Sequence, residues 1–277
     1  YKEGTYMPRL TKNEIFELAS KLPAVSTAAT QLINIIEDAK TSRNQIVDLL
    51  KVDEILFAEC FKQANSAAIG AFRKFITIHE IVDVLGFSHL KRVALFVAAK
   101  SVIDDPKIWY ESVFTAVAAD HLARKNRFDY HLCDAVYMAA LFQNFGAFLL
   151  NHFYPKLYKE INKIVDYEDR LAAQEKEFGY NALEISALLL KNFSIPDYVV
   201  DIVANQYNVY GPKARKENVF IEIGRILQEM QDKPLGDIHK TLETESVQES
   251  MMTSGIEMVN IDQDMLSLLK EHTAQFA

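Results

Sequence analysis

The sequence predicts an all-α protein, and three observations carry this prediction. Apolar residues recur at helical spacing in several segments, for example at Leu90, Val93, Ala94, Val97 and Ala98. Long apolar–polar alternation, which marks half-buried strands, is absent from the sequence. Only 9 glycines and 7 prolines interrupt the 277 residues, and such sparse punctuation favours long helices over many short strands.

Each expected helix has its own local evidence. In a capping box, a Ser or Thr and a Glu or Gln three residues later satisfy two backbone N–H groups at a helix start. The sequence fits this box at Thr11, Ser42, Thr77 and Ser246. Further apolar stripes run through residues 25–36, 135–149 and 219–230, and Pro196 suits the first turn of another helix. Residues 231–262 are polar and expected to be loop-rich, before a final helix around 265–276.

The sequence Asp104-Asp105-Pro106 is the clearest boundary in the chain. It separates an N-terminal helical lobe, residues 1–105, from a larger helical lobe with a C-terminal extension, residues 106–277. The extension is acidic, because residues 241–277 hold seven acids and one base out of a net charge of −8. Neither lobe has the basic excess of a nucleic-acid-binding protein, so we expect no direct nucleic-acid binding.

The sequence has no signal-peptide pattern, and no apolar run in it reaches the length of a membrane span. We therefore expect a soluble, cytoplasmic protein without membrane contact. The chain begins at Tyr1 and not at an initiator Met, and whether a receiver or output domain precedes it is left open.

Two groups of motifs resemble one known family. In the first lobe, Ala64-Asn65-Ser66 stands near a helix end, and residues 78–86 (IHEIVDVLG, ending at Gly86) follow about a dozen residues later. In the second lobe the motifs are WYES at 109–112, AALFQNFG at 139–146 and FGYN at 178–181, followed by the segment from Ile195-Pro196 to Asn205-Gln206. This pattern, over roughly residues 18–210, resembles the HDOD domain, a bacterial signalling relative of the HD phosphohydrolases.

The resemblance implies an all-helical, HD-like bundle with an added N-terminal helical lobe. It also implies a regulatory role, because HDOD domains are mostly regulatory modules, often paired with receiver or cyclic-dinucleotide domains. The positions that would carry the metal ligands of an HD enzyme hold Glu111, Gln143, Asn144, Asn181, and Asn205 or Gln206. An amide pair does not replace an imidazole and a carboxylate around a metal, so we expect no metal, no cofactor and no catalysis.

The same residues have structural alternatives. The amides are either a vestigial pocket that reads a small ligand or a structural polar cluster, and Asn181 with Glu184 fits a helix-capping pair. In the first lobe we interpret Asn65, Ser66 and Gly86 as structural. Asn65 would end its helix in the left-handed conformation that Asn tolerates, and Ser66 would bind local backbone.

Three functions stay open at this point. The first is a non-catalytic signal-transduction module that acts on a protein partner, downstream of a receiver or cyclic-dinucleotide signal. The second is a sensor that binds a nucleotide or cyclic dinucleotide in the vestigial pocket. The third is a phosphohydrolase with an atypical metal site around Glu111.

Overall fold

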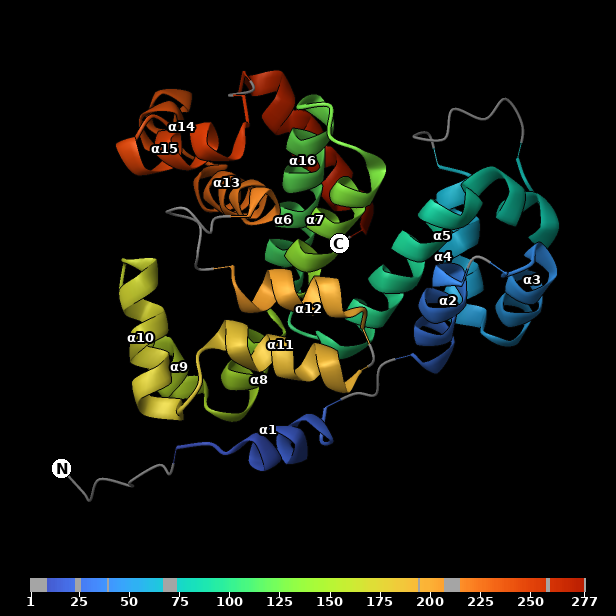
Figure 1. The fold of residues 1–277 in the computed structure, drawn as a ribbon, viewed down its shortest axis with the longest axis horizontal. Coiled ribbons are helices and arrows are strands. Elements are labelled where there is room, and N and C mark those ends of the chain that lie inside the picture. The colour runs from blue at the N-terminus through green and yellow to red at the C-terminus, as the bar shows by residue number, and fades with distance from the viewer. Residues whose placement is uncertain are drawn as a thin grey trace. The chain divides into compact units, whose positions relative to one another are not determined.

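The computed structural model describes residues 9–22, 26–38, 40–66, 74–193, 195–206, 215–257 and 260–276. These segments are helical with connecting turns and contain no strand, so the all-α prediction is confirmed (Figure 1).

The chain divides into two compact units. One contains residues 23–104 and 193–195 and is called the α5 unit here; the other contains 1–22, 105–192 and 196–277 and is called the α6 unit. One step between the units falls between Asp104 and Asp105, within the Asp104-Asp105-Pro106 sequence and one residue before the division predicted after residue 105. Two further segments lie on the other side of that division, since the N-terminal segment through Leu22 belongs to the α6 unit and residues 193–195 belong to the α5 unit.

The α5 unit consists of α2 (Thr27–Glu37), α3 (Arg43–Val52), α4 (Glu54–Ala64) and α5 (Ile78–Val102). Helix α5 packs against each of the other three. Its apolar stripe from Leu90 to Ala98 is buried, as the helical spacing predicts. An ion pair between Arg43 Nε and Asp83 Oδ1, 2.6 Å long, joins α3 to α5 on the surface.

The HDOD-like motif of the first lobe has structural roles. Gly86 has φ +66° and ψ 173°, a conformation that is essentially restricted to glycine, and it divides α5 at a kink. Asn65 does end α4, but its φ is −99°, so the expected left-handed conformation is wrong. Its side chain instead spans the chain to Phe75: Oδ1 accepts from Phe75 N at 2.7 Å, and Nδ2 donates to Phe75 O at 3.0 Å. Ser66 N–H donates to Gln63 O, which is a local backbone bond.

The α6 unit is built around α6 (Pro106–Lys125), which packs against α7 (Tyr130–Phe142), α13 (Lys216–Met230) and α16 (Gln263–Phe276) (Figure 1). Its other helices are α1 (Lys12–Ala19), α8 (Phe145–Phe153), α9 (Pro155–Ile161), α10 (Tyr167–Phe178), α11 (Ala182–Asn192), α12 (Asp197–Ala204), α14 (Leu235–Leu242) and α15 (Glu245–Ser254). Helix α1 packs against α8 and α11, and Leu10 N–H donates to Phe178 O at 2.7 Å. These contacts explain why the N-terminal segment belongs to this unit.

Three of the four expected capping boxes are confirmed, at Thr11, Ser42 and Thr77. The fourth is wrong, because α15 begins at Glu245 and places Ser246 inside the helix, where its carbonyl accepts from Ser250 Oγ. Pro196 precedes α12 as its N-cap and does not enter the first turn. The segment 231–262 was expected to be loop-rich, but it contains α14 and α15, which bury Ile238, Leu242, Val247 and Met251.

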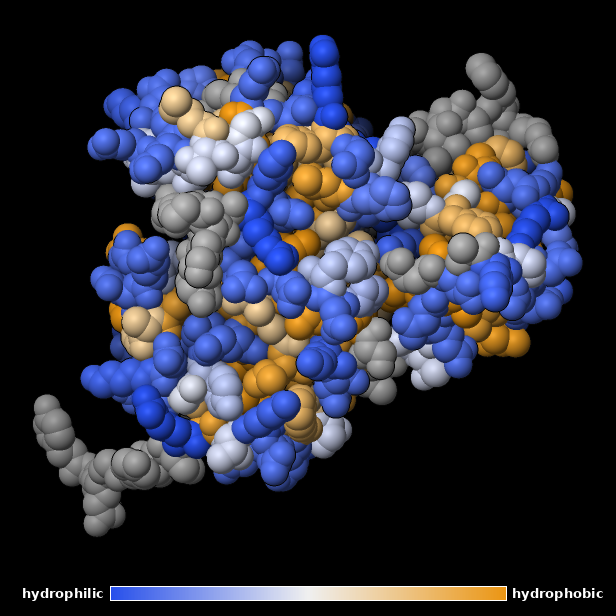
Figure 2. All heavy atoms as spheres, viewed as in Figure 1, coloured by the Kyte–Doolittle hydropathy of each residue, from blue (hydrophilic) through white to orange (hydrophobic). Residues whose placement is uncertain are grey.

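One helical stretch is apolar enough to span a membrane by length and composition, contrary to the expectation from the sequence. It runs from Tyr130 to Phe153 through α7 and α8, with a mean hydropathy of 1.3 in its most apolar window. Within the protein 83% of that window is buried, and a buried core helix passes the same test. On the face drawn in Figure 2, hydrophobic areas lie between hydrophilic side chains.

Candidate functional site

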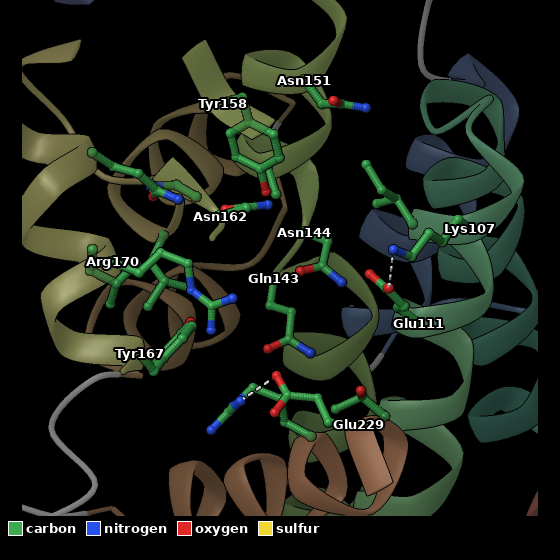
Figure 3. Close-up of a pocket in the computed structure, with 18 of the residues that line it drawn as sticks. Lys107, Glu111, Gln143, Asn144, Asn151, Tyr158, Asn162, Tyr167, Arg170 and Glu229 are labelled. Atoms are coloured by element: carbon green, nitrogen blue, oxygen red, sulfur yellow. Dashed lines mark hydrogen bonds and ion pairs between the residues drawn. The ribbon is translucent and has the colours of Figure 1, made fainter. Parts of the chain in front are cut away.

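A cavity of about 720 Å³ lies within the α6 unit. Residues of α6, α8, α9, α10, α11 and α13 line it, together with the Gln143-Asn144 step between α7 and α8 (Figure 3). The polar lining residues include Lys107, Glu111, Gln143, Asn144, Asn151, Tyr158, Lys159, Asn162, Tyr167, Arg170, Gln174, Arg225 and Glu229. A volume of this size falls in the range of small-molecule pockets, ~300–1,000 Å³.

The start of α6 forms one wall of the cavity. Asp105 caps the helix, and its Oδ1 accepts from the N–H groups of Lys107 and Ile108 at 2.9 and 3.1 Å. Its Oδ2 accepts from Asn151 Nδ2 at 3.3 Å, which ties the start of α6 to α8. One turn further along α6, Glu111 faces the cavity with Lys107 Nζ at 3.8 Å (Figure 3). Helix capping therefore positions this carboxyl.

The break between α7 and α8 forms a second wall. Ser186 on α11 holds it in place, because its Oγ accepts from Gly146 N–H at 2.8 Å and lies 2.6 Å from Gln143 O. Gly146 permits this arrangement, since a Cβ atom there would lie 2.0 Å from Ala182 O. The apolar stripe at 135–149 thus belongs to two helices, and the turn between them directs Gln143 and Asn144 to the cavity.

Hydrogen bonds fix the orientation of both amides. Gln206 Nε2 donates to Gln143 Oε1, so the Gln143 amine is left for the cavity. Asn144 Nδ2 donates to Ser112 Oγ on α6 at 3.0 Å, so Asn144 Oδ1 is left for the cavity. Figure 3 shows the nitrogen of Asn144 turned towards α6 and its oxygen turned the other way. Neighbouring residues therefore present one hydrogen-bond donor and one acceptor.

The wall formed by α9, α10 and α13 carries charged side chains that are partly paired. Arg225 donates to Glu222 through two nitrogens, at 2.5 and 2.9 Å, and to Glu229 at 2.6 Å. Its guanidinium also lies 4.5 Å from the ring centre of Tyr167. Arg170 lies 5.2 Å from the same ring centre. Within the described part of the chain, neither Arg170 nor Lys159 has a carboxylate within 4 Å.

Burial changes the proton equilibria of the lining. It raises the pKa of Glu111 above the usual range of a carboxyl group, and the nearby charge of Lys107 offsets this only in part. Burial also raises the pKa of Tyr167 to about 12 and raises the pKa of Tyr158. For Arg225 burial acts in the opposite direction, but the hydrogen bonds and charge of Glu222 outweigh it and raise the pKa. Arg225 therefore stays charged, and both phenols stay neutral near pH 7.

The structure separates the six pocket residues expected from the sequence. Glu111, Gln143 and Asn144 line the cavity, and the buried Gln206 supports Gln143 from behind. The other two have local structural bonds. Asn181 Oδ1 accepts from Glu184 N–H at 3.0 Å while Asn181 N–H donates to the Glu184 carboxylate at 2.9 Å, which confirms the capping pair. Asn205 Nδ2 donates to Asp201 O, and Asn205 O accepts from Asn218 Nδ2.

Most of the cavity lining after residue 151 was not predictable from the sequence motifs. These lining residues lie outside the quoted motifs, on α9, α10 and α13 or at the C-cap of α9: Tyr158, Asn162, Tyr167, Arg170 and Arg225. One signal was available, since Tyr167 and Arg170 are three residues apart and share a helix face. Arg225 on α13, which lies over the ring of Tyr167, has no such signal in the sequence.

The lining does not fit the metal centre of an HD phosphohydrolase. In the segments that the structure describes, no three His, Cys, Asp or Glu side chains lie close enough together to hold a metal ion. Glu111 is a carboxylate at the resembling positions, but its neighbours Gln143 and Asn144 are neutral amides already bound to Gln206 and Ser112. Such a donor set is poor for Zn²⁺, Mn²⁺ or Fe²⁺.

Comparison with known proteins supports the same family over most of the chain. The model of the HDOD domain matches residues 22–209. An uncharacterized protein of Treponema pallidum (strain Nichols) is 25% identical over 214 residues, which are 74% of this chain and 39% of that protein. The chain thus spans well under half of this relative's length.

Solved structures share the fold at low sequence identity. An HDOD domain protein of unknown function from Geobacter sulfurreducens is 20% identical with a TM-score of 0.70, covering 96% of this chain and 95% of that one. A candidate phosphohydrolase from Shewanella amazonensis SB2B is 18% identical with a TM-score of 0.70, covering 95% and 98%. A candidate signal transduction protein from Marinobacter aquaeolei VT8 is 18% identical with a TM-score of 0.64, covering 98% and 63%. With the match over residues 22–209 and the helical architecture described above, the chain belongs to the HDOD domain family.

Proposed function

We propose that this protein is a non-catalytic HDOD module of a signal-transduction pathway, which acts by binding and not by hydrolysis. The observation that carries the proposal is the use of amides at the positions that resemble metal-ligand positions. Gln143 is hydrogen-bonded to Gln206, Asn144 to Ser112, and Asn181 caps α11 with Glu184. These side chains serve the fold and the orientation of the cavity wall.

The chemical reason is the missing route to hydroxide. An HD enzyme lowers the pKa of a metal-bound water, and this requires imidazole and carboxylate ligands converging on the metal. Glu111 alone does not supply that set, and its raised pKa and the neighbouring Lys107 disfavour metal binding further. The third function left open by the sequence, a phosphohydrolase built around Glu111, is therefore the least supported.

A signalling role is supported by the family and by the protein of Marinobacter aquaeolei VT8 described as a candidate signal transduction protein. In this proposal the helical units present a surface to a protein partner, and an upstream receiver or cyclic-dinucleotide signal shifts the population of binding-competent conformations.

The test is a hydrolysis assay of the purified chain with a panel of nucleotides in Mn²⁺ and in Mg²⁺, with metal content measured on the same sample. The expected result is no bound metal and no product above the buffer control. The matched variant is Glu111→Gln, which removes the carboxylate that lines the cavity. Hydrolysis by the wild type that is lost in Glu111→Gln would overturn the proposal.

A second function, a ligand sensor, is favoured by one specific observation. The cavity of about 720 Å³ is open to ligands and lined by polar groups of fixed orientation. A ligand that binds only the folded state raises the free energy of unfolding by about 2.7 kcal/mol when its concentration is ~100 times its Kd. A thermal-shift screen against metals, nucleotides and cyclic dinucleotides therefore detects such binding. If no compound raises the melting temperature, the sensor function is rejected and binding to a protein partner is the function that is still supported.

A further inference from the structure

Two cationic side chains of the cavity make no ion pair with a carboxylate among the described residues. Lys107 is opposite Glu111, and Arg225 is held by Glu222 and Glu229. Asp105 is occupied with the N–H groups of α6 and with Asn151. Lys159 on α9 and Arg170 on α10 have no carboxylate within 4 Å in the described segments. One wall of the cavity therefore carries two cations that make no direct ion pair with the described residues.

The break between α7 and α8 contributes neutral hydrogen-bonding groups to the cavity. There Gln143 offers its Nε2 amine and Asn144 offers its Oδ1 oxygen, and neither atom has a hydrogen-bond partner among the described residues. Both residues are tethered by bonds to the rest of the unit, so the pair is oriented before a ligand arrives. The two atoms belong to different side chains, so a ligand that carries both an acceptor and a donor satisfies them through two separate hydrogen bonds. The pairing edge of every nucleobase carries both a donor and an acceptor, and side-chain amides are groups that read bases in nucleic-acid complexes.

In Figure 3 the side chain of Arg170 extends towards Gln143 and Asn144. Inorganic phosphate alone would neutralise the two cations. It fills only a small part of the cavity, however, and near neutral pH it carries few protons to donate to Asn144 Oδ1. A cyclic dinucleotide carries two bases, whereas the wall presents one donor–acceptor pair.

We propose that this cavity binds a nucleoside monophosphate, with the phosphate at Lys159 and Arg170 and the base edge at Gln143 and Asn144. This proposal deepens the sensor function above and rests on it. The ligand bridges α9 and α10 to the α7–α8 break, so its binding links helices that are otherwise held together by few polar bonds across the cavity. The base contact selects the ligand and the phosphate contact supplies most of the affinity, because charge-assisted bonds are the stronger ones.

The experiment is titration calorimetry of the full chain with the four nucleoside 5′-monophosphates, the matching nucleosides and inorganic phosphate. We expect at least one monophosphate to bind about tenfold more tightly than its nucleoside and than phosphate. Removing one charge-assisted contact weakens binding by about tenfold or more, so Arg170→Gln and Lys159→Gln should each raise the Kd by that factor. Lys176→Gln is the matched control, because Lys176 is exposed on α10 and outside the cavity, and its Kd should stay within twofold.

A second variant tests the base contact separately. Gln143→Glu keeps the oxygen that accepts from Gln206 and replaces the amine that faces the cavity with a second oxygen. Binding of the uncharged nucleoside should be lost in this variant, which excludes simple repulsion of the phosphate as the cause. Melting of each variant, followed by fluorescence of the buried Trp109, shows whether it folds.

The outcomes separate this proposal from the proposed function. No binding of any monophosphate at millimolar concentration overturns the ligand class and leaves the non-catalytic function standing. Phosphate binding as tightly as the monophosphates overturns the base contact, and equal weakening by Lys176→Gln and Arg170→Gln overturns the location. A monophosphate that binds and is recovered as nucleoside and phosphate supports the ligand class and overturns the non-catalytic function.

Discussion

Replacing Gly146 by Ala tests the close crossing of α8 and α11 that holds the Gln143-Asn144 wall. A Cβ atom at Gly146 would lie 2.0 Å from Ala182 O and 2.9 Å from Ile185 Cβ. Real Cβ contacts essentially never fall below 3.0 Å, so the neighbouring backbone has to move by at least 1.0 Å (3.0 − 2.0). The backbone of α11 cannot rotate away as a long side chain would.

The magnitude follows from two opposing effects. Overpacking of a well-packed core costs ~1–3 kcal/mol, and contact with backbone places this site at about 3 kcal/mol. Ala is the better helix former by about 1 kcal/mol, so the free energy of unfolding should fall by about 2 kcal/mol. At ~2–4 °C per kcal/mol for a chain of this size, the melting temperature should drop by about 4–8 °C.

Trp109 is a convenient probe of this change. It is the single Trp of the chain, it is buried on α6, and α6 belongs to the same unit as α8 and α11. The control is Gly236→Ala in α14, where nothing lies within 4 Å of the added Cβ and an increase of about 0.4–1 kcal/mol is expected. A Gly146→Ala variant that melts at or above the wild-type temperature would refute the close crossing.

Substitutions at three further residues test the other features discussed above. Gly86→Ala should cost ~1–3 kcal/mol because φ +66° with ψ 173° suits glycine alone, and Gly86→Asn should be equally poor; a tolerated Asn, seen by circular dichroism, would contradict that conformation. Asn65→Asp should lose about 1–3 kcal/mol, because the second oxygen would face Phe75 O at the site of a 3.0 Å bond; an unchanged denaturant midpoint would argue against the bridge. For Glu111 the raised pKa means that ionisation destabilises the folded state, so stability is lost as pH rises through the folded pKa. The stability of Glu111→Gln relative to the wild type should therefore increase from pH 4 to pH 7, and a decrease measured by Trp109 fluorescence would remove burial as the cause.

Features of the fold that depend on neighbours in the sequence were predictable. The box at Thr11 closes within a single turn, so the four residues contain all of its physics. The same pattern failed at Ser246, because Thr244 adopts the extended N-cap conformation two residues earlier and leaves Ser246 inside α15. A cap needs both the residue type and the backbone conformation, and the sequence specifies only the first with certainty.

The candidate site was predictable in part for the same reason. Gln143 and Asn144 stand out because a continuous apolar stripe surrounds them, and the structure places both at the cavity. Asn181 belongs to the same group of motifs, yet its bonds with Glu184 are local and keep it out of the lining. An amide next to a helix end either faces the cavity or caps the helix, and tertiary packing around that helix end decides which of the two occurs.

The sequence alone thus specifies an all-α chain, most of its helix starts, its acidic C-terminal extension and the amides at the resembling ligand positions. Tertiary packing specifies the cavity, because Arg170 and Arg225 meet at the ring of Tyr167 from different helices, and Arg170 has no carboxylate within 4 Å among the described residues. It also specifies which atom of Gln143 faces the cavity, since Gln206 reaches that residue only after α12 has packed against α7. Helix periodicity acts over a few residues, whereas the chemistry of this cavity depends on contacts between helices that are distant in the chain.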